Sequence, residues 1–354
     1  MSNEHQGALA ERVSEPVIPQ EVAKDISLLE QQFIRAEVEQ LRQSVLSFRP
    51  LFEKRAKIIA HPEVASNFWL RVLSNAPADI DEYISSSDAA ILGSALKSLN
   101  VERFELDEKG QGEPRSIRFT FEFATGDANP FFENEKLVKE FYWRKQVLTT
   151  PSGKKRTWDG LVSEPVRINW KKDMDITKGL LDAACDLFEA EKKGGDRKEL
   201  PEAKNLVGKL AEVEALEEEE EDEDDEYPSQ TPGSSFFNFF GYRGSDVTAE
   251  HSATATKEEN ERFEKILKGE NVEDDEADDD EEVDDDFDTF EVFPDGGELA
   301  IALAEDLWPN ALKYYVQSFE EVPDFDEDDL EEGDESDDEN DEDEASRPRK
   351  KTKV

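Results

Sequence analysis

Apolar side chains recur every three or four positions from Glu21 to about Ala60, and charged residues occupy the positions between them. This spacing predicts an amphipathic helix. About 40 helical residues would span roughly 60 Å, which is long for a helix packed inside one small domain. We therefore expect the helix to pair with the same helix of a second chain, as a coiled coil or an antiparallel dimer. The alternative is a stripe buried against the chain's own core. Pro50 is predicted to kink or break the helix.

The apolar stripe of this helix supplies the residues predicted to hold two chains together. They are Ile26, Leu29, Phe33, Val38, Leu41, Val45, Phe48 and Phe52. Further helices are predicted over residues 64–72, 87–99 and 183–210, where apolar residues again follow helical spacing.

The period of the pattern changes to two near Phe104 and Leu106, and the alternation is clearest from Ile117 to Phe123. This predicts a hairpin with one buried face and one solvated face. Two more strands are predicted around residues 138–148 and 166–170. The expected fold class is therefore α+β, with an antiparallel sheet of about four strands and helices that cover one face.

Charge divides the second half of the chain. The 90 Asp and Glu residues outnumber the 42 Lys and Arg residues, so the formal net charge is -48. Acidic runs occupy residues 217–226, 273–288 and 321–344, and runs of like charge are normally disordered. Two apolar islands, Ser234–Tyr242 and Gly297–Val316, separate these runs, and we expect both to dock on the domain formed earlier in the chain.

These patterns predict eight segments. They are a disordered lead-in (1–20), a dimerisation helix (21–61), a domain of helices and strands (62–210), an acidic linker (211–233), a short apolar segment of the domain (234–243), an acidic insertion (244–296), the C-terminal helices of the domain (297–320) and an acidic tail that ends in a basic cluster (321–354).

The residues offer no arrangement typical of an enzyme or of a cofactor site. The three histidines, His5, His61 and His251, have no neighbouring cysteine or carboxylate pattern that predicts zinc or a nucleophile. No P-loop or dinucleotide motif is present. Cys185 lies among apolar residues, so we expect a buried thiol. The N-terminus has no apolar segment typical of a secretory signal, and no run of about 18 apolar residues predicts a membrane span.

Several motifs occur together in one order: FRPLFEKRAKIIA at 48–60, NFWLRVLSN at 67–75, IRFTFEF at 117–123, NPFFENEKLVKEF at 129–141, INWKKDMDITKG at 168–179, SSFFNFF at 234–240 and EDLWPNALKYY at 305–315. With these motifs the chain resembles the nucleosome assembly protein family, in particular its SET (template-activating factor) branch and the fungal relatives that cooperate with a histone acetyltransferase. The connections around SSFFNFF are longer and more acidic here than in the SET pattern.

The resemblance implies a long helix that pairs two subunits and an "earmuff" domain with a four-stranded antiparallel sheet. It also implies a nuclear homodimer without enzymatic activity or cofactor, which binds core histones through acidic surfaces. Exchange with the cytoplasm is left open. The alternatives are a regulatory partner of a histone acetyltransferase, a phosphatase inhibitor, and a general polyanionic or ion-buffering protein. Direct binding to nucleic acid or membranes is not expected, because the chain is strongly acidic.

Three sets of residues are candidates for function. Those predicted to contact histones are Glu164, Asp173 and Asp175 near the predicted fourth strand and Asp326, Asp328, Asp329, Glu331 and Glu332 in the tail. Ser336 is a candidate for phosphorylation because acidic residues surround it. The cluster predicted to act as a nuclear import signal comprises Arg347, Arg349, Lys350, Lys351 and Lys353.

Overall fold

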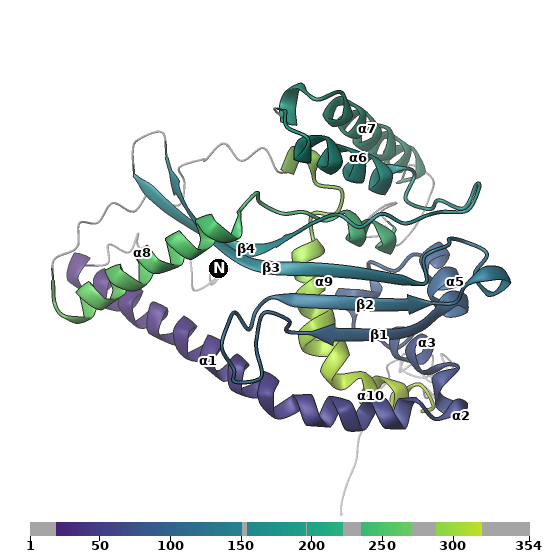
Figure 1. Cartoon of the computed structure of the whole chain (residues 1–354), viewed down its shortest axis with the longest axis horizontal. Coiled ribbons are helices and arrows are strands. Elements are labelled where there is room, and N and C mark those ends of the chain that lie inside the picture. Colours follow the sequence, from purple (N-terminus) through teal and green to yellow (C-terminus); the bar gives the residue numbers. More distant parts are fainter. Residues whose placement is uncertain (1–18, 151–153, 196, 222–234, 271–287, 321–354) are drawn as a thin grey trace, which may run out of the picture. The chain divides into compact units, whose positions relative to one another are not determined.

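The computed structural model describes residues 19–150, 154–195, 197–221, 235–270 and 288–320. The chain forms two units, Met1–Ser318 and Phe319–Val354. All of the helices and strands given below belong to the first unit, shown in Figure 1.

Helix α1 runs without interruption from Gln20 to Ile59, so the predicted amphipathic helix is confirmed. It passes through Pro50, and the prediction of a break there is wrong. Contacts on both sides of the proline hold the helix in place. The Arg49 side chain donates to the carbonyl of Leu106 at 2.6 Å, and Arg55 donates to the carbonyl of Trp308. A proline removes one backbone hydrogen bond, and these tertiary contacts offset that loss.

Four short helices lead from α1 to the sheet: α2 (Pro62–Ala65), α3 (Phe68–Leu73), α4 (Ala78–Asp81) and α5 (Ser86–Ala95). A capping box formed by Ser85 and Asp88 starts α5. The same buried Asp88 carboxylate accepts the backbone N–H of Phe236 at 3.0 Å. One carboxylate therefore caps a helix and fixes a segment almost 150 residues away.

The sheet consists of β1 (Leu96–Glu102), β2 (Ile117–Phe123), β3 (Lys136–Thr149) and β4 (Lys155–Ser163), in the order β1-β2-β3-β4. Neighbouring strands are antiparallel. The predicted fold class, α+β with a four-stranded antiparallel sheet, is confirmed.

Two of the four strands lie elsewhere than predicted. The helix predicted over 87–99 ends at Ala95, and β1 follows at once because Leu99 and Val101 enter the core from alternate positions. Phe104 and Leu106 belong to the connection after β1. The fourth strand is formed by 155–163 and not by 166–170, because the hairpin returns directly after residue 154. Residues 166–170 bond instead to segments outside the sheet. The N–H of Val166 donates to the carbonyl of Phe240 at 2.8 Å, and the N–H of Glu133 donates to the carbonyl of Asn169 at 2.9 Å.

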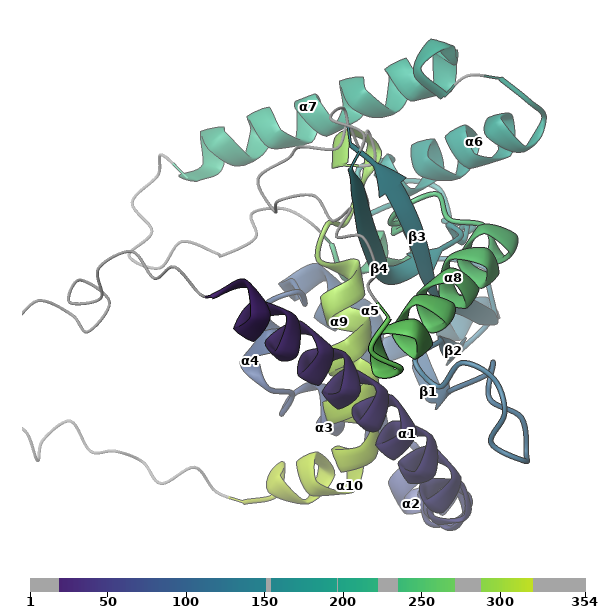
Figure 2. The same ribbon diagram turned by 90° about the vertical axis from the view of Figure 1, so that its left-hand side faces the viewer.

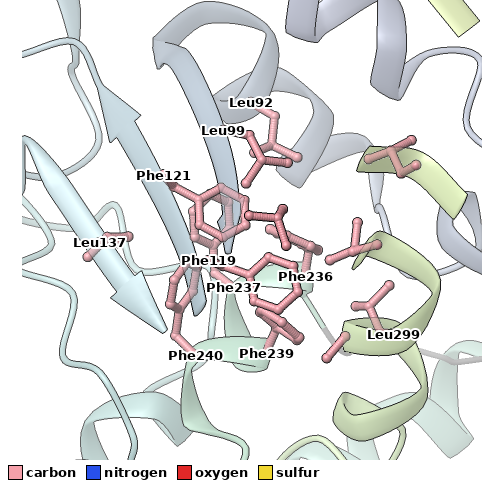
Figure 3. Close-up of a cluster of buried hydrophobic side chains, with 14 of the residues drawn as sticks. Leu92, Leu99, Phe119, Phe121, Leu137, Phe236, Phe237, Phe239, Phe240 and Leu299 are labelled. Carbon is pink, nitrogen blue, oxygen red and sulfur yellow. The ribbon is translucent and has the colours of Figure 1, made fainter. Parts of the chain in front are cut away.

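The core lies on the inner face of the sheet. Alternate residues of β2 are buried, and the 3-10 helix η4 (Phe236–Gly241) packs its phenylalanines against them. Figure 3 shows this cluster, which α5 and α9 (Gly296–Ala302) close with Leu92 and Leu299. The ring centroids of Phe121 and Phe240 are 5.4 Å apart in an edge-to-face arrangement. The first apolar island is thus part of the core, as expected.

The second island forms α9, a π-helical turn at Leu303–Leu307 and α10 (Trp308–Gln317). The side chain of Ile301 in α9 is 40% exposed, although the island is apolar. The wider π turn rotates the residues on its two sides relative to each other, so Leu307 and Trp308 face the core and Ile301 does not.

The acidic half of the chain contains more helix than predicted. The helix predicted over 183–210 is two helices, α6 (Leu180–Lys192) and α7 (Pro201–Glu221), which Gly194 and Gly195 separate. Helix α8 (Ala249–Leu267) lies inside the segment predicted as an acidic insertion. Three further 3-10 turns are η2 (Gly126–Ala128), η3 (Arg197–Glu199) and η5 (Asp288–Phe290).

Candidate functional site

The N-terminal half of α1 has an uncovered apolar face. Ile26 is 42% exposed, Leu29 is 52% exposed and Phe33 is 60% exposed. Val22 and Ile34 extend the same exposed surface. Contiguous apolar surface of this kind is unusual on a soluble monomer and marks a surface that another molecule covers.

The C-terminal half of α1 forms one wall of a groove of about 1030 Å³. Four of the five remaining predicted contact residues line it, namely Leu41, Val45, Phe48 and Phe52. The fifth, Val38, is partly buried and does not line the groove. Strand β1 forms the opposite wall, and Trp308 and Pro309 close one end. The structure therefore places the predicted stripe in two environments. Its first three residues lie on an exposed face, and four of its last five line the groove.

Arg55 fixes this end of α1 to α10. Its guanidinium carbon lies 3.9 Å from the centroid of the Trp308 ring and 4.7 Å from that of Phe52, and it donates to the Trp308 carbonyl. Trp308 in turn stacks on Trp69 with the ring planes 4° apart. Burial lowers the pKa of Arg55 to about 10, so it remains charged at neutral pH. The groove end is a rigid aromatic and cationic cluster.

The predicted histone-contact residues in the folded unit differ in their availability. Glu164 is exposed and its carboxylate lies 3.1 Å from Lys192. Asp173 is exposed, and it adopts a left-handed backbone conformation with φ of 61°. Asp175 is engaged in a turn, because its carboxylate accepts the N–H groups of Thr177 at 2.8 Å and Gly179 at 3.0 Å. Glu164 and Asp173 therefore have carboxylates on the surface, whereas that of Asp175 holds the turn before α6.

Helix α6 has an acidic face that the sequence patterns above did not single out. Asp182, Asp186 and Glu189 lie on one side of the helix, and Arg167 contacts them at 2.9, 2.6 and 3.3 Å. Three carboxylates around one guanidinium leave an excess of two negative charges. The spacing of four and three residues is the signal that could have revealed this face.

The other candidates lie outside the residues that the structure describes. They are the tail residues Asp326, Asp328, Asp329, Glu331 and Glu332, the phosphorylation candidate Ser336, and the basic cluster of Arg347, Arg349, Lys350, Lys351 and Lys353.

A buried polar cluster ties β3 to the residue after β4 and to the C-terminal end of η4. Lys139 donates to the carbonyls of Glu164, Phe240 and Tyr242 at 2.8, 3.1 and 2.6 Å. Burial lowers the pKa of Lys139 to about 7, although three carbonyl acceptors favour the ammonium form with its three N–H groups. Cys185 is buried, as predicted, and burial raises the pKa of its thiol to about 11.

The carboxylate of Glu291 joins the two ends of the insertion. One oxygen accepts the N–H groups of Arg243 at 2.9 Å and Gly244 at 3.0 Å. The other accepts those of Val292 at 2.9 Å and Phe293 at 3.1 Å. Burial raises the pKa of Glu291, and the backbone N–H groups of Gly244, Arg243 and Phe293 oppose that shift. The chain therefore leaves and re-enters the domain at a single side chain.

Within the described residues, no group of three or more His, Cys, Asp and Glu side chains is arranged to hold a metal ion. None of the described helices has the length and hydrophobicity needed to span a membrane.

The comparison with known protein families decides the identity of this fold. The model described as "Nucleosome assembly protein (NAP)" matches residues 61–318, which is more than half of the 354 residues. The chain belongs to the nucleosome assembly protein family. Membership supports a general role as a histone chaperone in nucleosome assembly.

Curated members of this family are similar over different lengths. A putative nucleosome assembly protein of Schizosaccharomyces pombe is 29% identical over 313 residues, which is 87% of this chain and 86% of that protein. Protein SET of Drosophila melanogaster is 29% identical over 133 residues, or 38% of this chain and 42% of that protein. NAP1-related protein 2 of Arabidopsis thaliana is 26% identical over 278 residues, or 78% of this chain and 66% of that protein. Among solved structures, Ccp1 matches 86% of this chain and 98% of its own with 24% identity and a TM-score of 0.48.

Proposed function

We propose that this protein is a homodimeric histone chaperone that shields core histones until they are placed on DNA. The family match over residues 61–318 carries the proposal, because it identifies a fold whose members are named for nucleosome assembly. The net charge of -48 supports it, since histones are rich in Lys and Arg. Acidic segments attract such partners and compete with DNA phosphates for them.

The dimer would form through α1. Its bare N-terminal face around Phe33 has the chemistry to occupy the groove of a second copy, which Val45 and Phe48 line. Antiparallel pairing of two equal helices brings each N-terminal half against the other's C-terminal half, so both apolar surfaces are covered at once. This supports pairing through α1 over a stripe buried within one chain.

Histone contact on the folded unit would involve the acidic face of α6, defined by Asp182, Asp186 and Glu189, together with Glu164 and Asp173. Exposed ion pairs are each weak, of the order of 0–1 kcal/mol, so affinity would need many of them. The acidic tail would supply additional charge, and phosphorylation of Ser336 would increase it.

A nuclear location follows from this role, and the basic cluster at 347–353 is the proposed import signal. A histone acetyltransferase is a proposed partner, since a chaperone can present histones to such an enzyme.

The test compares how the full chain and a variant bind folded core-histone complexes. The variant ends at Val316, and its acidic runs at 217–226 and 273–288 are neutralised. Retained binding at about 0.15 M salt, where charges are screened beyond roughly 8 Å, would support specific recognition by the folded unit. An excess of DNA should then compete poorly with the full chain for histones.

Complete loss of binding by this variant would contradict recognition by the folded unit and favour a general polyanionic protein. A basic non-histone protein of similar charge is the matched control ligand. Equal affinity for that protein and for the histone complex would also argue for a polyanion. Glutamate at Ser336 should strengthen histone binding by the full chain if phosphorylation acts through charge.

A further inference from the structure

The outer part of the β3–β4 hairpin extends beyond the rest of the sheet. Pairing between β2 and β3 ends at Phe141, whereas β3 continues to pair with β4 as far as Thr149. The outer part of β3, residues 142–149, therefore has an edge that β2 does not cover. A two-stranded ribbon is only marginally stable on its own, and uncovered edges favour association with other strands.

Helix α8 covers this edge. The backbone N–H of Lys145 donates to the hydroxyl of Ser252 at 3.0 Å, and the Lys145 ammonium lies 2.6 Å from the carboxylate of Glu259. Ser252 and Glu259 are seven residues apart, which is two helical turns, so they project from the same side of α8. The insertion thus supplies the partner of the Lys145 backbone N–H and the nearer of the two carboxylates beside its ammonium, the other being Asp159 of β4 at 3.7 Å.

The same helix contacts the N-terminal half of α1. The guanidinium of Arg35 donates to the side-chain oxygen of Asn260 at 2.6 Å and lies 4.1 Å from the centroid of the Phe263 ring. Both views of the chain show α8 beside this part of α1, and Figure 2 shows the two helices most clearly. α8 therefore bridges two elements that come from distant parts of the sequence.

The bridge is polar and shallow. Ala255 is the buried residue of α8, and its other residues are exposed or partly exposed. Hydrogen bonds and single ion pairs at a surface contribute about 1 kcal/mol each, so α8 can detach without unfolding the core.

We propose that α8 is a releasable brace that couples the N-terminal half of α1 to the outer part of the β3–β4 hairpin. Loosening one end of the brace should loosen the other, because a coupling free energy acts equally in both directions. The proposal does not require that the protein binds histones. If α1 pairs two subunits, the brace also connects the dimer contact to the hairpin.

Hydrogen exchange of the full chain, followed by mass spectrometry, tests the coupling. Phe263→Ala removes a contact with α1 and leaves those with β3. We expect amide exchange to accelerate about fivefold both in α1 around Arg35 and in the hairpin around Lys145, which corresponds to about 1 kcal/mol. The reciprocal variant, Ser252→Ala with Glu259→Ala, removes contacts with β3 and should accelerate exchange in the same two regions.

The matched control is Glu258→Ala, which removes an exposed carboxylate from the same helix. It should leave exchange in both regions unchanged. The proposal is overturned if each test variant accelerates exchange only in the element whose contact it removes, because the two sites are then independent. It is also overturned if neither variant changes exchange in α1 or in the hairpin.

Discussion

Lys139 shows how a single charged residue can hold three segments of the core together. Its position in β3, between Leu137 and Phe141 on the buried face, places an amine where alternation alone predicts an apolar side chain. The three carbonyls around it come from the residue after β4 and from the C-terminal end of η4. The three acceptors replace water around the amine, and removal of the amine would leave three carbonyls without that donor.

Lys139 should make stability depend on pH. Its pKa is about 7 in the folded chain and about 10.4 in an unfolded one. Between these values the unfolded chain binds more protons, so the free energy of unfolding should rise with pH, by at most about 1.4 kcal/mol per unit. Lys139→Met removes this titration. The measurement is denaturant unfolding of both proteins between about pH 6 and about pH 9. Above about pH 7 the free energy of unfolding should rise more steeply with pH in the unsubstituted chain than in the variant. Parallel profiles would show that Lys139 stays charged throughout.

At the scale of elements, α1 differs from the other helices because its two halves have different surroundings. The C-terminal half is anchored by Arg49 and Arg55. Apolar side chains are exposed along both halves, among them Leu29 and Phe33 in the first half and Leu51 in the second. A helix that packed only within its own chain would have no reason to expose Leu29 and Phe33. The exposed stripe therefore supports the proposal that α1 contacts a second copy of the chain.

Acidic substitutions in this stripe should separate the proposed dimer. Phe33→Asp with Leu41→Asp places a charge on the bare face and another in the groove, so sedimentation should report monomers. The matched control is Gln32→Asp with Gln40→Asp, which adds the same charges about 100° away around the helix. The control should remain dimeric. A dimer in the first variant would mean that α1 is not the contact.

Sequence patterns predicted the long helix, the helical α3 segment and strands β2 and β3. The apolar period is clear in the helices and in β2, whereas in β3 the buried Lys139 interrupts it. They misplaced β1, where the chain passes from helix to strand at Leu96 without a turn residue. They also missed β4, whose Trp158 and Gly160 do not follow a clean alternation of apolar residues. Helix α8 was missed because its contacts are polar. The acidic face of α6 depends on Arg167, which reaches it from another segment, so sequence spacing gave only part of it.

At the scale of the whole molecule, two kinds of association should respond to salt in opposite ways. Histone binding through acidic surfaces would rely on charge, whereas pairing through α1 would rely on apolar burial. Raising the salt from about 0.1 M to about 0.5 M should therefore weaken histone binding by at least about tenfold and leave the dimer intact. Fluorescence titration and sedimentation at the two salt concentrations measure both. Dimer dissociation at high salt would assign the pairing to charged residues instead.

The position of Glu291 has a consequence for engineering. The Glu291 carboxylate holds together the two ends of the segment that runs from Gly244 to Glu291. The distance between these ends therefore does not depend on the length of the segment. The entropy cost of closing a loop grows only slowly with the length of the loop. This segment should therefore accept a reporter domain inserted into it. New chain termini opened in the same segment would give a circular permutant that leaves the four-stranded sheet unbroken.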